Sequence, residues 1–217
     1  MPYRSHDVAA AVKHLSKADP VLRRLIRRVG PFTLKTHRDR FDLLVRSILS
    51  QQISTKAARA IRLRLTDRVR PHGISPESIS RLSEQELRAV GLSAQKASYL
   101  RDLADHALSG RLRLHQLGRL DDEEVIEQLI AVRGIGRWTA QMFLMFALGR
   151  LDVFPHDDLG LRTSLKELYG LADLPDKKTS HAIAEPWSPY RSIATWYCWR
   201  LGDLKADPDQ DASVYPV

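Results

Sequence analysis

The sequence is poor in cysteine, in long apolar runs and in the patterns typical of β-sheets. Its 217 residues include one cysteine, Cys198, which excludes an internal disulfide and any zinc or iron–sulfur site with four cysteine ligands. No apolar stretch reaches the ~20 residues needed to cross a bilayer, and the N-terminal residues do not resemble a signal peptide. We therefore expect a cytoplasmic protein with no membrane partner.

Strands are not indicated anywhere, because no run alternates apolar and polar residues, whereas helical periodicity recurs along the chain. We expect an all-α fold, a single domain of residues 1–217 in two helical lobes with an active-site cleft between them. One lobe comprises about residues 41–150, and the other about residues 1–40 plus 151–217. Capping residues and glycine stops place the expected helices at 20–30, 41–49, 55–65, 83–90, 93–108, 121–132, 137–148, 159–169, 178–185 and 190–201.

Acidic residues are fewer than basic ones: the sequence has 26 Asp and Glu and 34 Lys and Arg, which gives a net charge of +8. Such an excess favours a polyanionic partner such as nucleic acid, although many basic proteins simply carry a well-solvated charged surface. The helix expected from residue 20 carries four arginines that we interpret as a solvated surface, with contact to nucleic acid as the alternative. They are Arg23, Arg24, Arg27 and Arg28.

Two glycines interrupt an apolar helical pattern in residues 129–142, LIAVRGIGRWTAQM. A glycine costs roughly 1 kcal/mol relative to alanine inside a helix, so we expect the break to have a function. Gly134 and Gly136 can adopt positive φ and leave N–H groups uncovered beside the helix that begins at Arg137, which suits a phosphate. No strand precedes the glycines, which excludes a dinucleotide-binding loop, and the Gly-Lys-Ser/Thr of a P-loop is missing. An ordinary helix–helix turn is the alternative.

The segment around these glycines resembles part of a known family. Residues 132–140, VRGIGRWTA, are similar to the hairpin of the helix-hairpin-helix DNA glycosylases, and residues 152–159, DVFPHDDL, match the loop and aspartate that follow it. The extra N-terminal β-rich domain of some members has no room in this chain. Three further segments resemble the 3-methyladenine DNA glycosylase II branch of the family: ILSQQIS at 48–54, GLSAQKA at 91–97 and WSPYRS at 187–192.

This resemblance implies a helix-hairpin-helix fold and an enzyme that takes a damaged nucleotide out of duplex DNA by base flipping. Asp158 occupies the family's catalytic position, where a carboxylate stabilises the positive charge that develops on the sugar as the base departs. Asp157 is expected instead to cap the helix that begins near Leu159. The implied product is an abasic site, the substrate of the next step of base excision repair.

Members of the family that also cut the strand carry a lysine nucleophile two residues after the second glycine, where this sequence has Trp138. An indole cannot form a Schiff base. We therefore expect a monofunctional hydrolase that acts on alkylated purines such as 3-methyladenine. Two alternatives stay open: a bifunctional glycosylase/lyase, and a non-enzymatic helix-hairpin-helix module that only binds DNA.

The resemblance also implies roles for residues around the expected site. Gln52 is the candidate wedge for the gap left by the flipped base, with Gln51 beside it. Trp138, Met142 and Trp199 are expected in the base pocket, where an aromatic face can stack on a cationic alkylated base. The hairpin residues expected at the DNA backbone are Arg133, Gly134, Ile135, Gly136, Arg137 and Thr139.

No cofactor is expected. Cys198 alone cannot form the four-cysteine iron–sulfur motif of a related branch, and His156 lacks a second pair of ligands at metal-binding spacing. The resemblance allows a monovalent cation at the hairpin carbonyls. The expected partner is double-stranded DNA with damaged bases, bound by a monomer in the cytoplasm, and at the nucleoid if the organism is a prokaryote.

Overall fold

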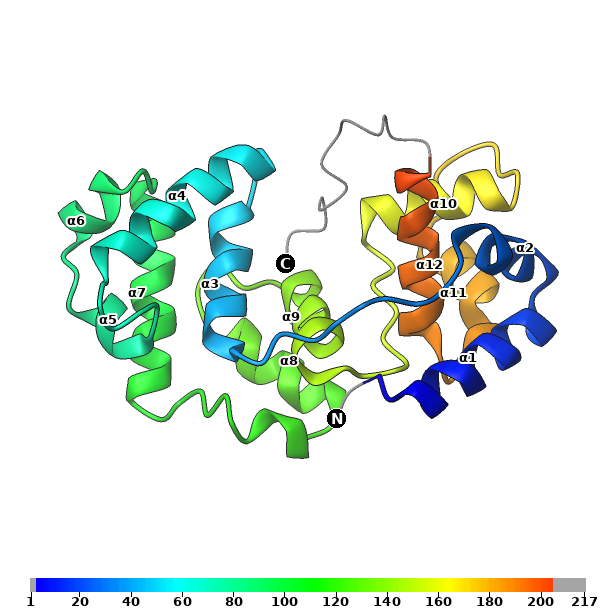
Figure 1. The fold of residues 1–217 in the computed structure, drawn as a ribbon, viewed down its shortest axis with the longest axis horizontal. Coiled ribbons are helices and arrows are strands. Elements are labelled where there is room, and N and C mark those ends of the chain that lie inside the picture. The colour runs from blue at the N-terminus through cyan, green and yellow to red at the C-terminus, as the bar shows by residue number, and fades with distance from the viewer. Residues whose placement is uncertain (1–2, 205–217) are drawn as a thin grey trace. The chain divides into compact units, whose positions relative to one another are not determined.

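Helices form all the regular secondary structure of residues 3–204, the part of the chain that the computed structural model describes. This part contains no strand, which confirms the all-α fold expected from the sequence (Figure 1). None of its helices combines the length and apolar composition that a transmembrane span needs. The described residues divide into two compact units, residues 37–143 and residues 3–36 with 144–204.

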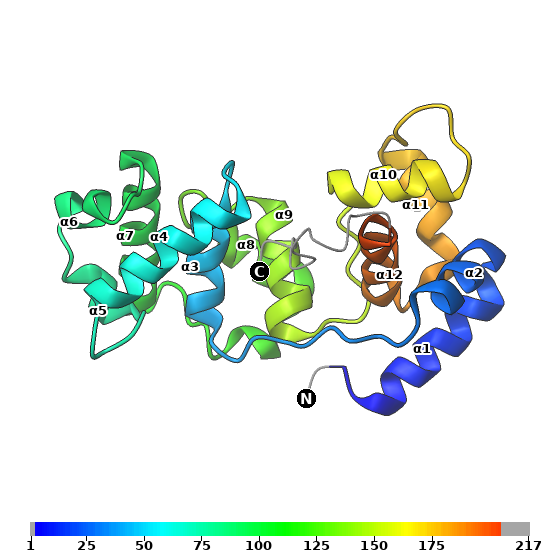
Figure 2. The same ribbon diagram turned by 45° about the horizontal axis from the view of Figure 1, so that its top comes forward.

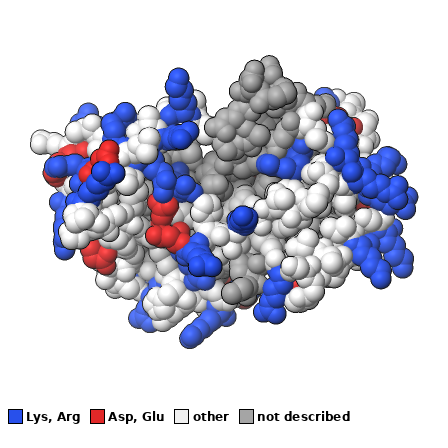
Figure 3. Space-filling model, in the orientation of Figure 1, with Lys and Arg blue, Asp and Glu red and all other residues white. Residues whose placement is uncertain are grey.

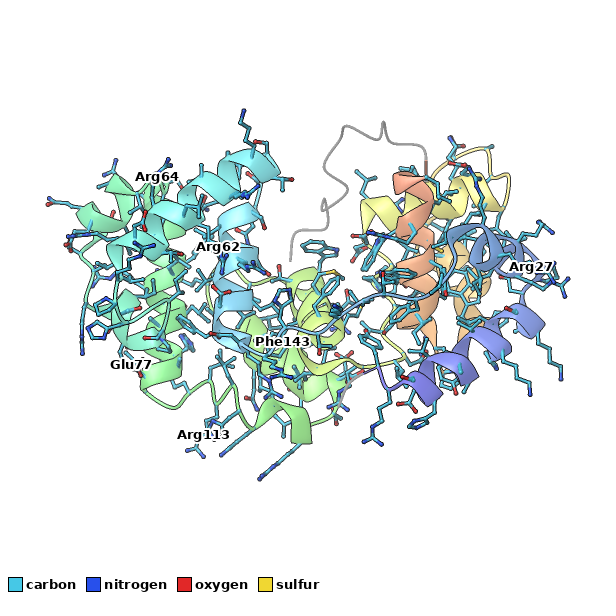
Figure 4. All side chains as sticks on the ribbon, in the orientation of Figure 1. Arg27, Arg62, Arg64, Glu77, Arg113 and Phe143 are labelled. Atoms are coloured by element: carbon cyan, nitrogen blue, oxygen red, sulfur yellow. The ribbon has the colours of Figure 1, made fainter. Side chains whose placement is uncertain are left out.

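Residues 37–143 form the hairpin unit, named for the glycine break that it contains. Its α-helices are α3 (Arg40–Ser50), α4 (Thr55–Arg68), α5 (Pro76–Ser80), α6 (Glu84–Ala89), α7 (Ala94–Leu108), α8 (Asp122–Ile130) and α9 (Arg137–Phe143). The long helix α7 packs against α3, α5 and α6, and α8 lies beside α9 (Figure 2). The core of the unit includes Leu44, Ile48, Leu65, Leu100, Leu129 and Phe143, the last of which is labelled in Figure 4.

Residues 3–36 and 144–204 form the aspartate unit, named for Asp158. Its helices are α1 (Ser5–Ala18), α2 (Pro20–Val29), a π-helical turn (Leu144–Leu148), α10 (Leu159–Leu168), α11 (Lys177–Ala184), a short 3-10 helix (Glu185–Trp187) and α12 (Arg191–Asp203). Helix α12 is central, because α1, α2 and α10 all pack against it. The aromatic side chains Trp187, Tyr197 and Trp199 are almost completely buried in this unit.

Local signals explain where several helices begin and end. Asp19 caps α2 by accepting hydrogen bonds from the backbone N–H groups of Val21 (2.8 Å) and Leu22 (3.0 Å), and the helix ends at Gly30 with φ of +87°. Asp121 caps α8 in a capping box with Glu124. These features follow from the preference of short acidic side chains for the N-cap and of glycine for positive φ. The cap and stop of α2 and the start of a helix near residue 121 confirm the sequence-based expectation.

Two helices are additional to those expected, and one expected helix is different. Helix α1 has no side-chain hydrogen bond at its N-cap and buries only Ala11 and Leu15, so its sequence signal is weak. Helix α5 is short, with five residues. The single helix expected over residues 137–148 is α9 followed by the π-helical turn. A π turn of this kind widens a helix by one residue and often occurs beside functional sites.

Candidate active site

Asp158 is a buried N-cap residue whose carboxylate is held by two helices. The residue is 9% exposed to solvent. One carboxylate oxygen, Oδ1, accepts hydrogen bonds from the Leu161 backbone N–H in α10 (2.6 Å) and from Nε1 of Trp199 in α12 (2.8 Å). The carboxylate therefore has a defined orientation at the N-terminal, positive end of α10.

The cap of α10 is Asp158, so the expectation that Asp157 caps this helix is wrong. The Asp158 N–H donates to the carbonyl of Pro155 (2.9 Å), and this turn places Asp158 at the N-cap. Asp157 is exposed, and its Oδ1 lies 3.3 Å from Nε2 of His156. The structural N-cap and the predicted catalytic position therefore coincide in one residue.

The loop that leads to Asp158 is anchored to the start of α12. Arg191 donates two side-chain hydrogen bonds to Asp152, from Nε (2.8 Å) and Nη2 (2.6 Å), and its backbone N–H adds a third (3.0 Å). Ser188 Oγ donates to Asp152 (3.1 Å), and Ser192 Oγ accepts from the N–H of Val153 (2.8 Å). Burial alone would raise the pKa of Asp152, but the hydrogen bonds from Arg191 outweigh burial and lower it. The segment 187–192 is thus structural support for this loop.

Trp199 is buried in the aspartate unit, with 1% of its surface exposed. Its ring stacks on Phe146 of the π-helical turn, with centroids 5.9 Å apart and planes inclined by 12°. The observed contact of its indole N–H is with Asp158, so Trp199 positions the carboxylate. Its expected contact with a base stays a prediction. Leu159, which the sequence reasoning did not select, is 64% exposed directly after Asp158.

Gly134 adopts positive φ (+82°), as expected for the hairpin. A Cβ at this position would lie 2.1 Å from Cδ2 of Tyr99, so the Tyr99 ring leaves room for glycine alone. Gly136 does not have positive φ, which corrects the expectation for it, and a Cβ there would meet no atom within 4 Å. The backbone around Gly136 is therefore open to an approaching strand. Ile135 (4% exposed) and Thr139 (6%) are buried, so their side chains contribute to packing.

Helix α7 supports the hairpin through Asp102, a residue that the sequence reasoning missed. Its Oδ2 accepts the backbone N–H of Arg133 (2.8 Å), and its Oδ1 lies 3.3 Å from Nε of Arg133. Burial alone would raise the pKa of Asp102, but the Arg133 N–H, His106 and the Arg133 side chain lower it. The sequence pointed to this residue only indirectly, because the family-like segment 91–97 leads into α7, the helix that carries Asp102.

The candidate wedge loop after α3 is tied to the hairpin. Gln51 donates from Nε2 to the carbonyl of Gly134 (2.8 Å), which joins the loop to the turn. Lys96 Nζ donates to the carbonyls of Leu49 (2.8 Å) and Gln51 (2.7 Å), and burial lowers the pKa of this amine. Gln52 is exposed in the left-handed region at φ of +55°. Such a conformation is uncommon for a residue other than glycine, and the loop holds the wedge candidate in it.

The remaining predicted residues of the hairpin unit lie on α9. Trp138 is half-buried and Met142 is 3% exposed. The exposed guanidinium of Arg137 forms an ion pair with Glu123 of α8, which places its charge at the surface of the hairpin unit. Their predicted contacts with a base or with phosphate stay predictions.

Metal-binding clusters are not found: no three His, Cys, Asp or Glu side chains among residues 3–204 are grouped to hold a metal ion. Cys198 is fully buried, and burial raises the pKa of its thiol. In the hairpin, the Gly134 carbonyl accepts the Gln51 amide and the Val132 carbonyl accepts the N–H of Ile135 (3.1 Å). A carbonyl oxygen has a second lone pair that a cation can share, so the expected monovalent cation stays a prediction.

The four arginines of α2 are all exposed. Figure 4 shows Arg27 at the outer surface of α2, and Figure 3 shows Lys and Arg side chains gathered where this helix lies. Their exposure agrees with a solvated surface. A role for them in contact with nucleic acid is not needed to explain the fold.

Comparison with known proteins places this architecture among DNA repair proteins. The family model described as "HhH-GPD superfamily base excision DNA repair protein" matches residues 45–189. DNA-3-methyladenine glycosylase 1 of Schizosaccharomyces pombe is 36% identical over 197 residues, which cover 88% of this chain and 86% of that protein. Alkylbase DNA glycosidase-like protein mag2 of the same yeast is 31% identical over 206 residues, 93% and 97% of the two chains.

Two solved structures have the same fold. The S. pombe 3-methyladenine DNA glycosylase Mag1, solved in complex with abasic DNA, has a TM-score of 0.82 and 35% identity over 90% of this chain and 98% of that chain. A DNA-3-methyladenine glycosidase from Bacillus halodurans has a TM-score of 0.80 and 40% identity over 88% of both chains. The similarity therefore extends over both units of the protein.

Proposed function

The chain belongs to the HhH-GPD superfamily of base excision DNA repair proteins, and on this basis we propose that it is a monofunctional DNA glycosylase. Its substrates are alkylated purines of the 3-methyladenine class in double-stranded DNA, as in the names of its relatives. The observation that carries the proposal is the carboxylate of Asp158, buried and oriented by Leu161 and Trp199. The product is an abasic site in an intact strand.

The enzyme must first take the nucleotide out of the duplex, which costs a few kcal/mol of unstacking and is easiest for a damaged base. The hairpin at Gly134 and Gly136 binds the DNA backbone. Contacts of this kind position the protein on the duplex without reading the base sequence. Gln52 fills the gap that the flipped base leaves. Gln51 and Lys96 support this role, since their hydrogen bonds hold the loop against the hairpin.

In the chemical step, the C1′–N bond breaks and its electron pair leaves with the base. Positive charge develops on the sugar, and the carboxylate of Asp158 stabilises it electrostatically. Water then forms the C1′–O bond and releases a proton. Because Leu161 and Trp199 fix the orientation of the carboxylate before the reaction, little reorganisation is needed in the transition state.

Base recognition is assigned to the half-buried Trp138, with Met142 one turn further along α9, whereas the buried Trp199 is assigned to positioning the carboxylate of Asp158. An alkylated purine can carry a positive charge, and stacking of a cation on an indole face is favourable. Trp138 also occupies the position of the lysine of strand-cutting members, so a Schiff base cannot form there. We assign the active form as a monomer in the cytoplasm that needs no redox cofactor, with the hairpin carbonyls as the site for a monovalent cation.

The test is an alkylated duplex incubated with the purified protein, with strands resolved before and after hot alkali and released bases identified by mass. Breaks that appear only after alkali are expected. Asp158→Asn should reduce base release roughly 10²- to 10³-fold, the usual cost of losing one electrostatic stabiliser, and should keep DNA affinity. Asparagine caps helices as well as aspartate does, so the fold is preserved. Asp157→Asn is the matched control and should retain activity.

The alternatives give different results in the same assay. Breaks without alkali would identify a glycosylase/lyase. DNA binding with no released base would identify a binding module that does not need Asp158. Base release by Asp158→Asn at the rate of the unmodified protein would refute the assigned mechanism.

A further inference from the structure

Gly160 is an exposed glycine in the first turn of α10, two residues after Asp158. Its φ lies outside the left-handed region, so its backbone conformation does not require glycine. Glycine is also a poor helix former compared with alanine. What distinguishes the position is therefore the space that its missing side chain leaves.

That space lies beside the Asp158–Trp199 pair. A Cβ on residue 160 would be 3.3 Å from Oδ1 of Asp158, 3.6 Å from Cδ1 of Trp199 and 3.8 Å from Nε1 of the same indole. The distance to Oδ1 is tighter than an ordinary van der Waals contact, and the other two are ordinary contacts. A methyl group would thus lie against Oδ1 of the carboxylate and beside the indole edge that donates to it.

We propose that Gly160 determines access to the catalytic carboxylate, a role that rests on the function proposed above. Without a side chain at this position, the deoxyribose of the flipped nucleotide can approach the carboxylate of Asp158 directly. A methyl group would hold the sugar away from the charge that stabilises it. Because misplacement by about 1 Å can reduce the rate of an enzymatic reaction 100-fold, a single carbon atom is enough to matter.

Gly160→Ala tests this proposal, with Gly202→Ala as the matched control. Gly202 is an exposed helical glycine in α12, also outside the left-handed region, and a Cβ there would meet no atom within 4 Å. Replacing glycine by alanine in a helix stabilises a protein by about 0.4–1 kcal/mol, so Gly202→Ala should raise Tm by about 1–4 °C and keep full activity. Gly160→Ala sets the same gain in helix propensity against the tight contact with Oδ1 of Asp158, so its Tm should change little.

Activity is measured as the single-turnover rate of base release on alkylated duplex with enzyme in excess. Gly160→Ala should lower this rate roughly 10- to 100-fold, and Gly160→Leu should lower it further. Affinity for undamaged duplex should be unchanged in both variants, because the hairpin binds the DNA backbone. A large loss of activity with little change in Tm is the signature of blocked access.

Three results would overturn the proposal. Full activity of Gly160→Ala, with Asp158→Asn inactive, would refute the role of Gly160 and leave the proposed function standing. Full activity of both variants would refute the catalytic role assigned to Asp158 as well. Lost activity accompanied by a lower Tm and an altered near-ultraviolet circular dichroism spectrum would show that residue 160 supports the packing of Trp199 and does not control access.

Discussion

Replacement of Trp199 by phenylalanine isolates the hydrogen bond that orients the catalytic carboxylate. Trp199→Phe removes the Nε1–H donor that lies 2.8 Å from Oδ1 of Asp158. A phenyl ring can keep the stacking on Phe146, whose centroid is 5.9 Å from that of the indole. After the change, Asp158 still accepts the Leu161 backbone N–H, so the cap of α10 remains while one of the two supports of the carboxylate is lost.

The size of the effect follows from the burial of the pair. A hydrogen bond to a charged group contributes about 1.5–3 kcal/mol, and each 1.36 kcal/mol of transition-state stabilisation corresponds to a factor of ten in rate. If the whole contribution acts on the transition state, the rate of base release falls roughly 10- to 150-fold. The affinity for duplex DNA should not change, because Trp199 is buried and does not face solvent.

The assay is single-turnover release of 3-methyladenine from alkylated duplex, together with a thermal melt of each variant. Trp196→Phe is the matched control, because Trp196 is also buried on α12 (5% exposed) and packs against Tyr197 instead of Asp158. Both substitutions remove similar volume and should lower Tm, Trp199→Phe by the larger amount because it also removes the hydrogen bond to Asp158. If Trp199→Phe releases base as fast as Trp196→Phe, the indole does not position the carboxylate, and the reasoning fails.

Two further predictions concern buried carboxylates. Burial alone would raise the pKa of Asp19, but hydrogen bonds from Trp187, Tyr169 and two backbone N–H groups lower it. Asp19 therefore stabilises the fold fully above its unfolded-state pKa of about 3.9, and this contribution disappears as the pH falls through the lower pKa of the folded state. Asp19→Asn should cost about 1–3 kcal/mol at pH 7 in urea melts, and a deficit that does not shrink in acid would contradict this account. Lysine in Arg191→Lys cannot reproduce the two side-chain hydrogen bonds to Asp152. The change should misplace the loop before Asp158 and slow base release roughly 10- to 100-fold at unchanged DNA affinity. A normal rate would show that the Arg191–Asp152 pair does not position this loop.

Local sequence signals predicted much of the helical fold. Asp19 and Gly30 mark the ends of α2, and Asp121 marks the start of α8, because caps and stops depend on a few neighbouring residues. The same kind of signal failed for α1, where Arg4 stands at the N-cap without a capping hydrogen bond. It also failed at Asp157, because the turn closed by the Pro155 carbonyl selects the cap of α10.

The sequence by itself determined that the chain is helical, that a glycine hairpin interrupts it and that Asp158 follows in a family motif. Only the tertiary structure decided that Trp199 donates to Asp158, that Tyr99 restricts Gly134 to glycine and that Gln51 joins its loop to the hairpin. Each of these contacts joins residues that are far apart in the chain. Periodicity and capping report on neighbours within a helical turn, whereas such contacts depend on how whole helices pack.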